Sequence, residues 1–123
     1  MRVDADRFRA LLLQLGQRPA GVRGPASALD GGGLTENEVY EYVQNMADEG
    51  LILAKFLPRS TGEGGGVAMI ERLTHKGQEL LTNIENQAVW SQAKEKAAVT
   101  GGKVSIAILV ELASTVLKHA LGL

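Results

Sequence analysis

The chain has 123 residues, of which 45% are hydrophobic, 22% charged and 4% aromatic, with fifteen glycines and no cysteine. At this length one domain can bury most of its apolar surface without covalent cross-links. The lack of cysteine excludes a disulfide framework, a thiolate zinc site and a cysteine nucleophile. The formal net charge is −1, which is not the charge of a protein that coats nucleic acid.

The sequence contains no recognisable export or membrane signal. Residues 1–9 are rich in charge and lead into leucines without a small-residue cleavage site. The most apolar stretch, residues 104–110, ends at Glu111 and is much shorter than the roughly 20 residues that span a bilayer. We therefore expect a soluble, cytoplasmic protein with no membrane partner.

A first helix is predicted from the apolar spacing of Phe8, Leu11, Leu12 and Leu15, with Asp4 as its N-cap. Gly16 is interpreted as a left-handed stop. The following segment, residues 18–34, contains five glycines and two prolines. This composition leaves room for one short turn or extended piece around residues 26–29, and a strand, a short helix and a loop all stay possible.

The second predicted helix has clear signals at both ends. Thr35 and Glu38 form a capping box, and Gly50 is the expected C-terminal stop with Leu51 packing behind it. Residues 51–57 and 67–73 are β-compatible runs around a glycine-rich tip, which predicts a hairpin.

Three further helices are expected after the hairpin. The first is capped by Thr74, the second covers residues 87–99 with Trp90, and the third begins at Ser105. Gly101 and Gly102 are expected to break the chain between the last two.

The order helix, irregular segment, helix, hairpin, helix is that of a winged helix-turn-helix. Residues 46–52, MADEGLI, resemble the end of a recognition helix that turns into the first wing strand. Residues 73–81, LTHKGQELL, resemble the run that follows the second wing strand in MarR-type and PadR-type regulators. In this run the threonine caps a helix, the glycine lets the helix lie close to the wing, and the leucines close the core.

Further positions extend the resemblance to the whole chain: Arg72 to Leu81, Val89, Trp90, Lys94, Gly101, Gly102, Ser105 and the closing residues 121–123. They are similar to a family of short bacterial and phage winged-helix proteins of unknown function. The resemblance implies an α+β fold, mostly helical with one β-hairpin wing and two additional C-terminal helices. Residues 1–86 would form the winged-helix-like domain. Residues 87–123 would form a helical pair that packs on it or makes a dimer interface.

The charge pattern bears on the DNA-binding function that this fold suggests. Residues 34–54 contain five carboxylates and no lysine or arginine, whereas residues 1–33 and 55–76 each carry a net +2. A helix that enters the major groove normally presents basic or amide side chains. The first hypothesis is a dimeric, DNA-binding-type transcription regulator of bacterial or phage origin whose contacts to double-stranded DNA come from Lys55, Arg59, Arg72, Lys76, Asn37 and Gln44.

The alternative hypothesis is a protein-interaction module or inhibitor from a mobile element, directed for example against a host defence complex. Its acidic helix, residues 36–49, would face a basic protein partner through Glu38, Glu41, Asn45, Asp48 and Glu49. The last helix has a broad apolar arc, and a homodimer would use Ile108, Leu112 and Val116 from it.

No enzymatic chemistry is indicated. His75 and His119 are far apart in sequence, and we expect neither to have a second histidine or a carboxylate at metal-ligand spacing. The glycine tracts at residues 31–33 and 62–66 lack the ending of a phosphate-binding loop. We expect a non-enzymatic protein without cofactor or metal.

Overall fold

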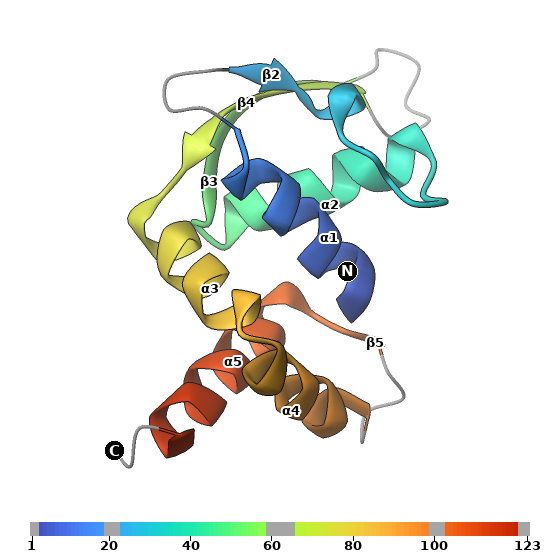
Figure 1. The fold of residues 1–123 in the computed structure, drawn as a ribbon. Coiled ribbons are helices and arrows are strands. Elements are labelled where there is room, and N and C mark those ends of the chain that lie inside the picture. Colours follow the sequence, from blue (N-terminus) through green and yellow to red (C-terminus); the bar gives the residue numbers. More distant parts are fainter. Residues whose placement is uncertain (1–2, 19–22, 59–65, 99–102, 121–123) are drawn as a thin grey trace.

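The computed structural model describes residues 3–18, 23–58, 66–98 and 103–120 (Figure 1). The elements in chain order are β1 (Val3–Asp4), α1 (Ala5–Gly16), β2 (Gly24–Pro25), the 3₁₀-helix η1 (Ala26–Ala28), α2 (Glu36–Asp48), β3 (Ile52–Pro58), β4 (Gly66–Leu73), α3 (His75–Glu85), α4 (Gln87–Ala98), β5 (Lys103–Val104) and α5 (Ile106–Ala120). Five α-helices and a three-stranded antiparallel sheet lie in the described ranges. The predicted mixed α+β class is confirmed.

The sheet has the order β2-β4-β3. Strands β3 and β4 form the predicted hairpin, with Ile52 opposite Leu73 and Leu57 opposite Val67. The hairpin is irregular between Leu53 and Ala54. The third strand comes from the glycine- and proline-rich segment, which therefore contains both a short strand, β2, and a short helix, η1. Residues 19–22 of that segment lie outside the described residues.

Helix α2 begins and ends as its sequence predicts. Thr35 accepts a hydrogen bond from the Glu38 amide, and the Glu38 carboxylate accepts one from the Thr35 amide, which completes the capping box. At the other end Gly50 has a φ of 75°, and the Leu51 amide donates to the Met46 carbonyl. This pattern is a Schellman motif, and the buried Leu51 supplies its apolar contact.

The interpretation of Gly16 as a left-handed stop is wrong. Gly16 is the last residue of α1 and is not among the glycines with positive φ. A Cβ atom at this position would lie 2.2 Å from Leu81 Cδ2 on α3. The glycine therefore permits close packing of two helices, rather than a change of backbone direction.

Helices α1 and α2 lie on one side of the sheet, and α3 leads from β4 to the α4–α5 pair at the other end of the molecule (Figure 1). The core is continuous across this arrangement, because Trp90 of α4 and Leu109 of α5 belong to the same buried cluster as α1 and α2. Strand β1 also pairs with β5, which ties residues 3–4 to residues 103–104. Residues 87–123, where described, thus pack on the preceding part of the chain.

Candidate functional site

Helix α2 has one buried side and one acidic, exposed side. Val39, Tyr40, Tyr42, Val43 and Met46 form the buried side against the sheet and η1. The exposed side chains, from the first turn to the last, are Glu36, Glu38, Glu41, Gln44 and Asp48. Asn37 and Asn45 are half-buried next to them. We call this surface the α2 acidic face.

The residues predicted to bind a partner differ in whether their side chains already form hydrogen bonds within α2. The Glu38 carboxylate is engaged in the capping box, and the side-chain Nδ2 of Asn45 donates to the Glu41 backbone carbonyl within the helix, at 2.9 Å. Glu41 and Asp48 lie about two helical turns apart on the exposed side. Their carboxylates, which form no part of either helix cap, are therefore the best positioned to meet a partner.

The C-terminus of α2 is held by the start of α3. Lys76 Nζ donates to the Glu49 carbonyl at 2.8 Å, and the Thr74 amide donates to the Leu51 carbonyl at 2.9 Å. The Thr74 hydroxyl donates to the Gly50 carbonyl and also caps α3 by accepting from the Gly77 amide. A Cβ on Gly77 would be 2.1 Å from the Leu51 carbonyl oxygen, so only glycine fits here without displacement. The predicted close approach of this helix to the hairpin is confirmed.

The predicted phosphate contacts are distributed along the hairpin and the start of α3. Lys55 is exposed and lies 3.7 Å from the Glu71 carboxylate. The Arg72 guanidinium donates to the Leu73 carbonyl at 3.1 Å. Lys76 makes the contact to α2 given above, and Arg59 lies outside the described residues. Each of the three described cations therefore contacts a group of its own chain.

The outward face of the hairpin is unexpectedly apolar. Its exposed side chains include Leu53, Leu57, Val67 and Met69, the first two alternating with Lys55 along β3. The predicted hairpin did not distinguish the inward from the outward residues of these strands. The period-two alternation of the β3 run could have identified the exposed set.

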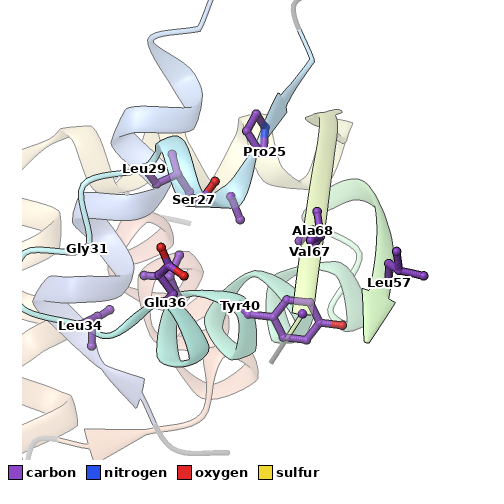
Figure 2. Close-up of a pocket in the computed structure, with 13 residues that line it drawn as sticks. Pro25, Ser27, Leu29, Gly31, Leu34, Glu36, Tyr40, Leu57, Val67 and Ala68 are labelled. Carbon is purple, nitrogen blue, oxygen red and sulfur yellow. The ribbon is translucent and has the colours of Figure 1, made fainter. Parts of the chain in front are cut away.

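A pocket of about 470 Å³ opens between η1, the start of α2 and the distal end of the hairpin (Figure 2). Its walls are mostly apolar: Pro25, Ala26, Leu29, Leu34, Val39, Leu57, Val67 and Ala68. The polar side chains of its lining are those of Ser27, Glu36 and Tyr40. No sequence motif predicted this pocket, because three separate segments build it.

Two buried tyrosines of α2 differ in the state of their hydroxyl groups. The Tyr42 hydroxyl accepts a hydrogen bond from the Asp4 backbone amide at 2.9 Å. Burial raises the pKa of Tyr42 above its usual value, and the hydrogen bond from Asp4 partly offsets this rise. The Tyr40 ring meets Phe56 edge to face at 5.6 Å. Its buried hydroxyl has no hydrogen-bond partner among the described residues.

A polar link between α1 and α4 was not predicted either. Lys94 Nζ lies 3.0 Å from Asp6 Oδ2, and Trp90 Nε1 donates to Asp6 Oδ1 at 3.4 Å. The hydrogen bond from Lys94 lowers the pKa of Asp6; partial burial opposes this, and the Trp90 bond adds to it. The Arg9 guanidinium lies 5.6 Å from the centre of the Trp90 ring. This cluster fixes the α4–α5 pair against α1.

The three residues predicted for a dimer interface have different accessibility. Val116 is 1% exposed and buried within the chain, so it cannot meet a second copy without repacking. Ile108 is 43% exposed, and Leu112 is half-buried. The accessible part of the apolar arc on α5 is therefore narrower than the sequence indicates.

The expectation that His75 has no carboxylate at ligand spacing is wrong. Its Nε2 lies 2.9 Å from Glu79 Oε1, one turn along α3, and both side chains are exposed. The described ranges contain no group of three or more histidine, cysteine or acidic residues that could hold a metal ion. Within the same ranges, no helix combines the length and apolar character needed to cross a membrane.

Comparison with known proteins places the chain in one family. A family described as "Hypothetical protein (DUF2513)" matches residues 2–103, which is most of the chain. Neither the curated proteins nor the solved structures include a significant match. The chain therefore belongs to the DUF2513 family, whose function is unknown.

Proposed function

We propose that this protein is a non-enzymatic, winged-helix-like domain that binds a basic surface of another protein through the α2 acidic face. The winged-helix assignment is supported by the order α1, β2, η1, α2, β3, β4 and by the sheet order β2-β4-β3. In this arrangement α2 has the position of a recognition helix, β3 and β4 form the wing, and η1 stands in place of the first helix of the motif.

The negative charge of α2 is the reason for proposing a basic protein as the partner. Residues 34–54 have a net charge of −5, and the exposed members lie along one side of the helix. Duplex DNA carries one negative charge for about every 1.7 Å of its axis, so it would repel this face. A basic protein surface would be attracted to it, which favours encounter and orientation.

Affinity capture with matched charge reversals tests this proposal. The variant Glu41→Lys/Asp48→Lys reverses two exposed carboxylates and leaves both caps of α2 intact. The control Glu85→Lys/Glu95→Lys makes the same change of net charge on exposed residues of α3 and α4. We expect the wild type and the control to retain the same partner proteins and the α2 variant to lose them. If all three baits retain the same proteins equally, the proposal is wrong.

A DNA-binding regulator is the second candidate, and the positions of Lys55, Arg72 and Lys76 on the hairpin and the start of α3 favour it. With Arg59 these residues could neutralise two to four phosphates, which gives a log–log salt slope of about −2 to −4. Fluorescence anisotropy with a random duplex at about 50 mM salt measures this directly. Saturable binding that is lost in Lys55→Ala/Arg72→Ala/Lys76→Ala would support the regulator and contradict the protein-binding proposal.

A further inference from the structure

Strand β3 lies at one edge of the sheet, because β4 is its partner and the sheet order is β2-β4-β3. The Thr74 amide donates to the Leu51 carbonyl, which fixes the alternation of hydrogen-bonded positions in this antiparallel pair. The irregularity of the hairpin adds a residue to β4 alone, so the alternation continues along β3. The odd-numbered residues of β3 therefore bond to β4, whereas Ala54 and Phe56 direct their N–H and C=O groups away from it. Pro58 has the next such position and ends the free edge, because it has no N–H.

The backbone groups at this edge have no partner in the part of the chain that the structure describes. Ala54 and Phe56 are half-buried, and the side chains that alternate with them are exposed. Two of these are apolar, with Leu53 41% and Leu57 70% exposed. An open strand edge is a template for the backbone of another chain, and apolar side chains in contact across the two strands stabilise the pairing. The edge therefore fits an extended segment that has apolar residues on its outward side.

Helix α2 lies next to this edge on the inward side of the sheet, where the Tyr40 ring meets Phe56. Gln44 and Asp48 follow Tyr40 by one and two turns on the same side of the helix, and both are exposed. Strand β3 begins just after α2 ends and runs back along it, so this row of side chains follows the strand. The opposite side of α2 faces η1, which places the row on the side of the free edge. The carboxylates of Asp48 and of the neighbouring Glu41 are therefore on the side to which the inward side chains of an added strand would point.

The charges on the two sides of β3 differ in sign. On the inward side Glu41 and Asp48 are joined by the negative C-terminal end of the α2 dipole. Lys76 brings one positive charge to that end, where it donates to a backbone carbonyl, and the net charge of residues 34–54 is −5. On the outward side the exposed cations are Lys55, next to the Glu71 carboxylate, and Arg72. Basic side chains are therefore attracted on the inward side and disfavoured on the outward side.

We propose that β3 binds an extended segment of the partner protein as an additional antiparallel strand. In this segment basic side chains, which point toward α2, alternate with apolar side chains, which contact Leu53 and Leu57. Antiparallel pairing continues the pattern of the existing sheet and is slightly more stable than parallel pairing. The inference rests on the proposed function, because it specifies what kind of segment the α2 acidic face binds.

Two peptides of identical composition test the alternation: acetylated, amidated VRVRVRV and its isomer VVRRRVV. Calorimetric titration of the purified full chain gives a Kd for each, and we expect the alternating peptide to bind at least about tenfold more tightly. In an antiparallel pair the arginines of this peptide lie opposite Ala54 and Phe56 and exchange hydrogen bonds with them. N-methylation of the arginine amides should therefore raise the Kd at least about tenfold, whereas N-methylation of the two inner valine amides should leave it nearly unchanged. Equal effects of the two methylations, or the reverse order, would overturn the proposal.

Amide hydrogen exchange locates the pairing on the protein. In the free chain we expect the amides of Lys55 and Leu57 to be protected by β4 and those of Ala54 and Phe56 to exchange rapidly. The alternating peptide should slow exchange at Ala54 and Phe56 and leave Lys55 and Leu57 as they are. Bound peptide without new protection at Ala54 and Phe56 would show that no strand is added to this edge.

Charge-reversed variants separate failure of this inference from failure of the proposed function. The alternating peptide should bind the wild type and Glu85→Lys/Glu95→Lys equally, and Glu41→Lys/Asp48→Lys at least about tenfold more weakly. If both peptides bind equally and both are lost in the α2 variant, the acidic face binds basic chains without strand pairing, so this inference alone is wrong. If the α2 variant binds the alternating peptide as well as the wild type does, the acidic face plays no part and the proposed function is contradicted as well. No binding at millimolar concentration would overturn the strand pairing, while protein capture with the same variants still decides the proposed function.

Discussion

Replacement of Gly77 by alanine tests the junction that positions α2 against the hairpin. The added Cβ would lie 2.1 Å from the Leu51 carbonyl oxygen and 3.0 Å from its carbon, both backbone atoms. Relief of this overlap requires α3 to retreat by about 1 Å, because such contacts are essentially never shorter than 3.0 Å. The movement also stretches the 2.9 Å bond from the Thr74 amide to the same carbonyl.

These contacts determine how much the Gly77→Ala substitution should destabilise the fold. Overpacking of this kind costs about 1–3 kcal/mol, and a weakened hydrogen bond adds about 1 kcal/mol. The better helix propensity of alanine offsets up to about 1 kcal/mol. We expect Gly77→Ala to lower the free energy of unfolding by about 1–3 kcal/mol, which corresponds to a fall in Tm of roughly 4–12 °C for a domain of this size.

Gly16→Ala is the matched control for this experiment. Its Cβ would meet Leu81 Cδ2 at 2.2 Å, a similar overlap, but the obstacle is the end of a flexible side chain. We expect a loss of less than about 1 kcal/mol, since Leu81 can move and helix propensity improves. Urea denaturation of both variants gives the comparison. If Gly77→Ala is as stable as the wild type, close approach to the Leu51 carbonyl is not the reason for glycine at this position.

Three further predictions concern stability. Tyr42→Phe should cost about 1 kcal/mol by chemical denaturation because a hydrogen bond is lost, whereas Tyr40→Phe should be neutral or stabilising because its hydroxyl has no described partner; an equal cost would contradict this. The lowered pKa of Asp6 means that its link to Lys94 contributes stability above about pH 4 and that this contribution is lost as the pH falls through the folded-state value. Asp6→Asn should therefore lose less stability than the wild type between pH 5 and pH 2.5, and parallel pH profiles would refute the assignment. Thr35→Ala should cost about 1 kcal/mol in a thermal melt, and an unchanged Tm would show that the capping box does not stabilise α2.

The features that the sequence predicted well are those decided by neighbouring residues. The N-caps at Thr35, Thr74 and Ser105 each depend on a side chain and an amide three residues away, and all three are formed. The hairpin was predictable for the same reason, because its strands are close in sequence and have β-compatible residues.

Features made by distant residues were missed or misread. Strand β2 has two residues and no periodicity, so only its pairing with β4 defines it. Gly16 matched the local pattern of a helix stop, but the structure needs glycine there because the side chain of Leu81 on α3 lies close to it. The pocket combines η1, α2 and the hairpin, and its polar residues Glu36 and Tyr40 look in sequence like ordinary members of an amphipathic helix. Of the candidate site, the acidic character of α2 was predictable, whereas the internal contacts of Lys55, Arg72 and Lys76 were not.

The function that we propose for the α2 acidic face is binding of a basic protein partner. Quantitative capture with the wild type, Glu41→Lys/Asp48→Lys and Glu85→Lys/Glu95→Lys as baits tests it most directly, with circular dichroism to verify that each bait is folded. We expect the same partner proteins to be enriched by the wild type and the α3–α4 control and to be lost from the α2 variant. Retention of those proteins by the folded α2 variant, at the level of the wild type, would contradict it.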